Sequence, residues 1–279
     1  MARLAKTKYE EVHMGQNQNT FEIWRGNSLI DASEIMVLVS GFRQRSENAK
    51  TLDMMQTWIV RTDISPFEAS KLGLDYAICG DCQIRKFLAR IRKDNAEIDN
   101  ISCYVDLARG VGGTWTSWSN GNIDQITPLE ASEKISQLKQ CECAKVHRRS
   151  NDCSNKPLGL RQGSYGDPAS VPPWVWADLL SMLGKAKTTS YTHRWETQDL
   201  QETSMASIDP QTYPDVNDAL DRAHARGYRT YRVLPKGEAL RPDEMLCPEA
   251  ENKTNCANCG LCSGMRRPNT PNIAIPAIS

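Results

Sequence analysis

The sequence has no excess of charge of either sign and no apolar run long enough to cross a bilayer. Lys and Arg together number 34, as do Asp and Glu, so the net charge at pH 7 is zero. No overall field therefore draws the chain towards nucleic acid or a lipid surface, although a local basic patch could still bind either. Apolar runs such as residues 35–39 are far shorter than a membrane span.

Two further features are missing. The N-terminal segment MARLAKTKYEE has no apolar core of the kind that a secretory signal peptide carries. No internal repeat of roughly 20–50 residues is visible, which argues against a solenoid or a propeller. The lack of a membrane span and of a signal peptide predicts a cytoplasmic protein with no membrane partner.

Cysteine, in contrast, is abundant: the chain has ten among 279 residues. Thiols in the cytoplasm are kept reduced, so clustered cysteines there indicate metal binding rather than disulfides. At least one metal centre is the strongest inference that the sequence allows.

The densest cysteine group lies near the C-terminus and consists of Cys247, Cys256, Cys259 and Cys262. Its C-x2-C-x2-C run has the spacing of bacterial ferredoxins, in which a remote cysteine followed by proline lies downstream of the run. Here the remote cysteine, Cys247, is also followed by proline but lies upstream. Four thiolates suit a structural zinc ion equally well. The spacing predicts a metal centre and leaves a cluster and zinc as alternatives.

A second group combines the CGDC segment with a cysteine of the next predicted strand, giving Cys79, Cys82 and Cys103. Three thiolates would leave one iron of a [4Fe–4S] cluster open to a ligand, which is the arrangement that S-adenosylmethionine chemistry requires. The alternative is a zinc site completed by Cys141, Cys143 or His147.

Those three residues and Cys153 form a third group within the segment KQCECAKVHRRSNDC. They could build a Cys3His zinc site, donate to either other centre, or be free thiols. The basic residues of this segment also hint at contact with phosphate or nucleic acid.

Strands alternate with helices along most of the chain, which predicts parallel β-α units. Strands are expected at 34–40, 55–61, 101–107, 157–162, 188–193, 203–208 and 228–234, and helices after Ser65, over 84–93, after Thr127, over 171–183 and over 213–226. The segment 109–122, rich in Gly, Trp and Ser, reads as a long functional loop or lid.

These elements predict a complete or partial β/α (TIM-like) barrel with cysteine-rich metal-binding loops and tail, and an open doubly wound sheet is the competitor. We expect an N-terminal arm over 1–33, the barrel-like domain over 34–240 and the cysteine-rich tail over 241–279.

Catalytic groups of parallel β/α folds lie where strands end and loops begin. The candidates at such positions are Arg161, Asp167, His193 and Arg232. His193 could be a general acid–base or a metal ligand, and the alternative is a histidine that satisfies buried backbone groups.

The segment RQGSYGDP is the richest of these strand ends. Gly163, Tyr165 and Gly166 are predicted to bind a cofactor, because glycines permit close approach of a ligand to the backbone. Asp167 precedes a proline and could equally cap the following helix.

The segments CGDC, CYVDL, GSYGDPASVP, YTHRW and the terminal C-x2-C-x2-C together resemble an uncharacterised cysteine-rich family of phage and mobile-element proteins, over most of residues 40–275. More distantly, they are similar to phage-borne radical-SAM-like β/α barrel proteins, although the chain lacks the C-x3-C-x2-C run of that group. The resemblance implies a barrel with a cluster at its mouth, in the cytoplasm of a bacterial host.

We therefore expect an iron–sulfur enzyme with one or two [4Fe–4S] clusters, with S-adenosylmethionine as a candidate cofactor and a small molecule, nucleotide or nucleic-acid-related compound as substrate. The alternative is a zinc-stabilised, non-enzymatic protein that binds nucleic acid or a host protein. A magnesium nuclease using Asp106, Asp167 and Asp209 is a third hypothesis.

Overall fold

The computed structural model describes residues 18–43, 48–94, 102–138, 158–184, 186–267 and 269–277. The third cysteine group, at 141–153, lies outside these residues. Within them the chain is a mixed α/β protein with two five-stranded sheets, one of them all parallel. In this described part, no helix combines the length and the apolar character needed to cross a membrane.

The first sheet has the order β1-β2-β3-β4-β5 and mixes antiparallel with parallel pairs. Its strands are β1 (Thr20–Asn27), β2 (Glu34–Ser40), β3 (Met55–Arg61), β4 (Leu160–Tyr165) and β5 (Thr188–Thr189). The first three form an antiparallel meander, and β3, β4 and β5 run parallel. Residues 20–27, which were expected to belong to an N-terminal arm, instead pair with β2.

The second sheet is all parallel and has the order β6-β7-β8-β10-β9. Its strands are β6 (Tyr191–Thr192), β7 (Met205–Ile208), β8 (Thr230–Leu234), β9 (Glu244–Leu246) and β10 (Asn272–Pro276). Because β10 lies between β8 and β9, the predicted tail supplies two strands of this sheet.

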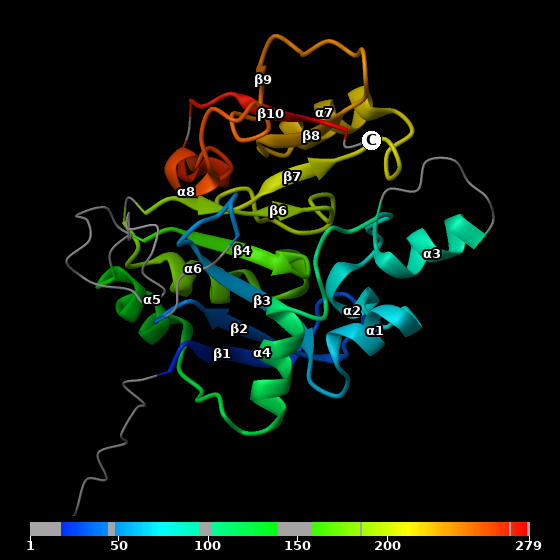
Figure 1. Ribbon diagram of the computed structural model, residues 1–279. Helices are drawn as coiled ribbons and strands as arrows, with labels where there is room; N and C mark the ends of the chain where they lie inside the picture. Colours follow the sequence, from blue (N-terminus) through cyan, green and yellow to red (C-terminus); the bar gives the residue numbers. More distant parts are fainter. Residues whose placement is uncertain are drawn as a thin grey trace, which may run out of the picture.

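The two sheets meet at Ser190, which separates β5 from β6. β5 pairs with β4 and β6 pairs with β7, so one short segment borders both sheets. Figure 1 shows the strands stacked from β1 at the bottom to β9 at the top. β1 and β9 are the outer strands of the series, and no closed barrel is seen among the described residues.

Eight α-helices accompany these strands in the described ranges. They are α1 (Pro66–Leu72), α2 (Tyr76–Cys79), α3 (Lys86–Asp94), α4 (Gly110–Ser119), α5 (Pro128–Ser136), α6 (Pro173–Leu180), α7 (Val216–Ala225) and α8 (Cys256–Cys259). The helices expected after Ser65 and Thr127 are both present, and each of these residues caps its helix. The Ser65 side chain accepts from the Glu68 backbone N–H at the start of α1, and Thr127 forms a capping box with Glu130 at α5.

Two sequence-based expectations about the segment before α5 are wrong. Residues 102–106 form no strand, because the Cys103 backbone N–H donates to the Ile84 carbonyl oxygen at 2.7 Å rather than to a neighbouring strand. The predicted loop at 109–122 contains α4. Its tryptophans hold the helix on the sheet: Trp115 Nε1 donates to the Arg61 carbonyl oxygen at 2.9 Å and Trp118 Nε1 to Glu22 at 2.6 Å. Tertiary contacts thus override the low helix propensity of the glycines.

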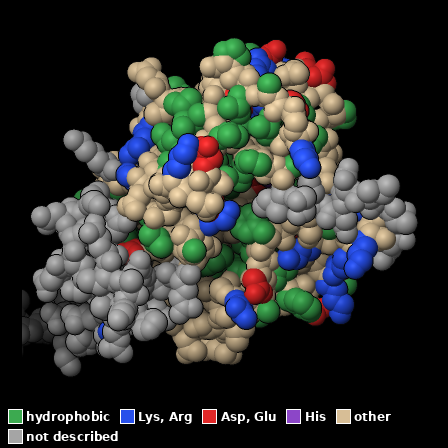
Figure 2. Space-filling model, turned by 45° about the horizontal axis from the view of Figure 1, so that its top comes forward, with side chains coloured by type: hydrophobic (Ala, Val, Ile, Leu, Met, Phe, Trp, Pro, Cys, Tyr) green, Lys and Arg blue, Asp and Glu red, His purple; other side chains and the backbone are tan. Residues whose placement is uncertain are grey.

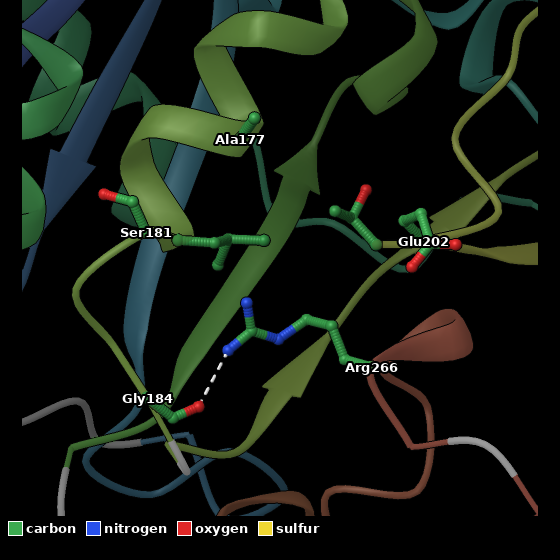
Figure 3. A pocket seen from close by; sticks show the side chains of 7 residues that line it. Ala177, Ser181, Gly184, Glu202 and Arg266 are labelled. Atoms are coloured by element: carbon green, nitrogen blue, oxygen red, sulfur yellow. Dashed lines mark hydrogen bonds between the residues drawn. The ribbon is translucent and has the colours of Figure 1, made fainter.

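The C-terminal segment is fastened to the body of the protein beside a small pocket of about 310 Å³. Figure 3 shows the Arg266 guanidinium reaching past α6 to the Gly184 carbonyl oxygen, to which it donates at 3.0 Å. The backbone N–H groups of Met265 and Arg266 donate to the carbonyls of Gln201 and Glu202. The loop that follows the last cysteine is therefore held in place by the body.

Candidate metal-binding cavity

One cavity of about 770 Å³ is lined by both cysteine groups that the structure describes. The cysteines on its walls are Cys79, Cys82, Cys103, Cys247, Cys256, Cys259 and Cys262. All of them are free thiols. The spacing in the sequence predicts the two groups, but only the fold brings them to a common space.

A single face of the strand series forms one wall of this cavity. Side chains at i and i+2 of a strand share a face, and most lining residues of the strands follow that rule, with Ser164 of β4 as an exception. They are Arg161, Gly163 and Tyr165 at β4, Thr189 and Tyr191 at β5 and β6, Tyr231 and Val233 on β8, and Ile273 and Ile275 on β10. Figure 2, with the top of the molecule turned forward, shows hydrophobic side chains gathered over the upper centre and Lys and Arg around them.

The first cysteine group is built by a turn and a crossing segment. Cys79 ends α2, and Gly80 with φ +56° lets the chain turn towards Cys82, whose N–H donates to the Cys79 carbonyl oxygen at 3.4 Å. Cys103 lies alongside because its N–H is bonded to Ile84. Cys79, Cys82 and the more distant Cys103 therefore all face the same cavity.

Burial sets the acid–base behaviour of this group. It raises the pKa of Cys79 well above its usual value, with further contributions from Asp75 and the neighbouring thiols, and it raises the pKa of Cys103. A bound cation reverses this balance and deprotonates a coordinating thiol. The group therefore suits metal ligation better than reaction as free thiolates.

The second group surrounds the short helix α8. Cys256 and Cys259 are its first and last residues, Asn255 caps it by accepting from the Asn258 N–H at 3.0 Å, and Gly260 in the left-handed region turns the chain towards Cys262. Burial raises the pKa of Cys256 to about 11 and that of Cys262 to about 12.

Long-range backbone bonds fasten this second group to both sheets. The Cys247 N–H donates to the Ala274 carbonyl oxygen of β10 at 2.8 Å, and the Cys262 carbonyl oxygen accepts from Ser190 at 2.9 Å. The Cys256 N–H donates to Lys50 at 2.7 Å. The four thiols are thereby held against the same wall as the first group.

The spacing of the side chains bears on which metal fits. In the described ranges, no three or more His, Cys, Asp or Glu side chains are gathered so as to hold a single ion. A tetrahedral zinc ion needs its sulfur ligands all at about 2.3 Å from one point. A cluster is larger, because each of its irons takes its own thiolate. The two cysteine groups are candidates for either centre.

His193 lies beside the first cysteine group. Its Nε2 is 3.6 Å from Asp209 Oδ2, and its backbone N–H donates to Asp167 Oδ2 at 2.8 Å. Burial would lower the pKa of His193, but Cys82 and Asp209 outweigh it and raise the pKa well above its usual value. The imidazole is held between a thiol and a carboxylate on the cavity wall.

The candidate carboxylates act mainly as caps. Asp167 accepts from the Ala169 N–H at 2.9 Å and caps the 3-10 turn Pro168–Ser170 rather than the predicted helix at 171–183, and it also lines the cavity. Asp209 accepts from the Thr212 N–H at 2.9 Å. Asp106 is not among the cavity residues. The structure therefore does not gather the three carboxylates of the nuclease hypothesis at this cavity.

Gly163, Tyr165 and Gly166, the residues predicted to bind a cofactor, all line the cavity. The Gly166 position also has a packing reason, because φ is +84° and a Cβ atom there would lie 2.7 Å from Ile59 Cβ. Tyr165 is 5% exposed, and its hydroxyl has no hydrogen-bond partner among the described residues. Burial raises the pKa of this phenol.

The two predicted arginines are separated by the sheet. Arg161 lines the cavity, whereas Arg232 does not, because it alternates with Tyr231 and Val233 and points to the opposite face. Arg232 forms a buried ion pair there with Glu244 at 2.6 Å and a second ion pair with the partly exposed Glu238 at 2.5 Å. This arrangement gives Arg232 a structural role in place of the predicted catalytic one.

Sequence reasoning missed several cavity residues. Tyr104 follows Cys103 and contacts Arg161, and Lys86 starts α3. Tyr191 and Tyr231 contact each other beside the second group, with ring centroids 4.4 Å apart and planes tilted by 50°. Of these, Tyr191 begins the YTHRW segment that the sequence had already singled out.

No known protein family matches the chain, and no curated protein or solved structure is significantly similar to it. The resemblance to phage proteins therefore stays a prediction.

Proposed function

We propose that this protein is an iron–sulfur enzyme of partial β/α-barrel architecture that holds two [4Fe–4S] clusters in one cavity and acts on a nucleotide-related substrate. The observation that carries the proposal is that all seven described cysteines line the same cavity. Metal sites that only stabilise loops have no need of a shared space, whereas a catalytic centre and its electron supply do.

The two groups differ in the number of thiolates that they offer. Cys247, Cys256, Cys259 and Cys262 supply a full set for a four-iron cluster. The first group supplies three, which leaves one iron for an external ligand such as S-adenosylmethionine or the substrate. We assign electron transfer to the second group and substrate chemistry to the first.

His193 is the side chain best placed to serve this chemistry. It lies next to Cys82, and Asp209 orients its imidazole. His193 would donate a proton to, or accept one from, a ligand bound beside the first group. Arg161 and Asp167 complete the polar part of the wall.

The architecture supports the same reading. Parallel strands β4, β5, β6, β8 and β10 present residues to the cavity, as the interior of a β/α barrel does, while the series remains open at its ends. An open series leaves a route for ligand entry that a closed and filled barrel lacks.

Metal and acid-labile sulfide content of anaerobically purified protein, with its visible spectrum, tests the proposal. Two clusters require about eight irons and eight sulfides per chain and a brown colour. Cys82→Ser and Cys259→Ser should each remove about half, while Cys153→Ser provides a cysteine change outside the two groups. Zinc without sulfide would overturn the proposal and favour a zinc-stabilised binding protein.

A further inference from the structure

We propose that the cavity contains an anion subsite, formed by Arg161, Lys86, Tyr104 and Tyr165, which binds the phosphate group of a nucleotide. The inference deepens the proposed function, because it names the group by which the substrate is held between the two cysteine groups.

The acidic side chains on the cavity wall are already compensated within the protein. Asp75 pairs with Arg85 at 3.0 Å, and Glu249 pairs with Lys50 at 3.1 Å. The two remaining carboxylates accept the N–H groups described above. None of them requires a cationic ligand.

Two cations on the wall have no such compensation. Arg161 and Lys86 line the cavity, and neither forms an ion pair with a carboxylate of the described residues. The Nε atom of Arg161 is buried without a hydrogen-bond partner. A guanidinium has five N–H donors, and one terminal nitrogen donates to the Tyr104 hydroxyl. Most of its donors are therefore left for a ligand.

The fold brings both cations close to the segment that contains Cys103 and Tyr104. The bond from the Cys103 N–H to Ile84 brings Tyr104 next to the start of α3, where Lys86 lies. Arg161 stacks on the Tyr104 ring at 5.6 Å. Lys86 is within electrostatic reach of Cys103, and Arg161 of Cys256. The subsite thus lies between the two cysteine groups.

The chemistry of these four residues fits a nucleotide. Two uncompensated cations suit a phosphate monoester, which carries about −1.5 to −2 charges at pH 7. The Tyr104 residue is 69% exposed and offers a ring face on which a base can stack. Tyr165 supplies a buried hydroxyl that lacks a partner, and leaving such a group unpaired is costly. The volume of about 770 Å³ is in the range of small-molecule sites.

Binding of AMP and GMP, compared with adenosine, guanosine and inorganic phosphate, tests the subsite. Calorimetry is done anaerobically on metal-loaded protein, and metal content is measured for every variant. We expect the monophosphates to bind about tenfold or more tighter than the nucleosides. Arg161→Gln and Lys86→Gln should each weaken monophosphate binding about tenfold and leave nucleoside binding unchanged. Lys93→Gln, an exposed position on α3 outside the cavity, is the matched control.

Equal affinity for nucleosides and monophosphates, or no binding of either by fully loaded protein, would overturn the inference. Tighter binding of S-adenosylmethionine that is lost in Arg161→Gln would assign the subsite to a carboxylate and overturn the phosphate. Phosphate-dependent binding by colourless, zinc-containing protein would retain the subsite and overturn only the iron–sulfur proposal.

Discussion

Replacing Arg232 by leucine should destabilise the fold strongly, whereas the same change at Arg241 should have little effect. The Arg232 side chain is 1% exposed and donates to both oxygens of Glu244, at 2.8 and 2.6 Å. Its loss leaves the equally buried Glu244 carboxylate without its guanidinium, which costs about 3–5 kcal/mol. Arg241 pairs with the exposed carboxylate of Asp221, and such pairs contribute about 0.2–1 kcal/mol.

Urea unfolding followed by tryptophan fluorescence measures both changes. Metal content must be held equal, because a bound ligand shifts the apparent free energy of unfolding. The double variant Arg232→Leu with Glu244→Leu removes the lone charge and should be less destabilised than the sum of the single variants. If Arg232→Leu unfolds like the wild type and instead loses ligand binding or turnover, the structural assignment of Arg232 is refuted.

Three further changes separate local from functional roles. Gly166→Ala should cost about 1–3 kcal/mol of unfolding free energy, because φ is +84° and Ile59 leaves no room for a methyl group, while Gly113→Ala on α4, where a Cβ meets nothing within 4 Å, should be neutral or slightly stabilising. The Thr127 backbone N–H lowers the pKa of Glu130, so the carboxylate contributes stability above the ordinary carboxyl pKa and loses it as the pH falls; Glu130→Ala should lower the urea midpoint at pH 7 and hardly change it at pH 3. His193→Ala should retain iron and sulfide, since the cysteines hold the cluster, and lower turnover about 100-fold or more, with reductive cleavage of S-adenosylmethionine as the first assay; loss of iron would instead identify His193 as a ligand.

The sequence by itself determined the features that depend on near neighbours along the chain. The cap residues Ser65 and Thr127 predicted the starts of α1 and α5, because a capping side chain bonds to a backbone group three residues away. The apolar run at 35–39 predicted β2, whose side chains are fully buried there. The cysteine spacing grouped the thiols for the same local reason.

Only the tertiary structure decided which of these features share a site. The face of β8 that meets the cavity depends on strand register, so the sequence could not tell that Tyr231 and Val233 line it while Arg232 is buried on the other side. Cys103 reaches the CGDC turn through a long-range backbone bond, and the second group reaches the same wall because β10 inserts between β8 and β9. Such contacts join residues far apart along the chain, and local propensity and spacing carry no information about them.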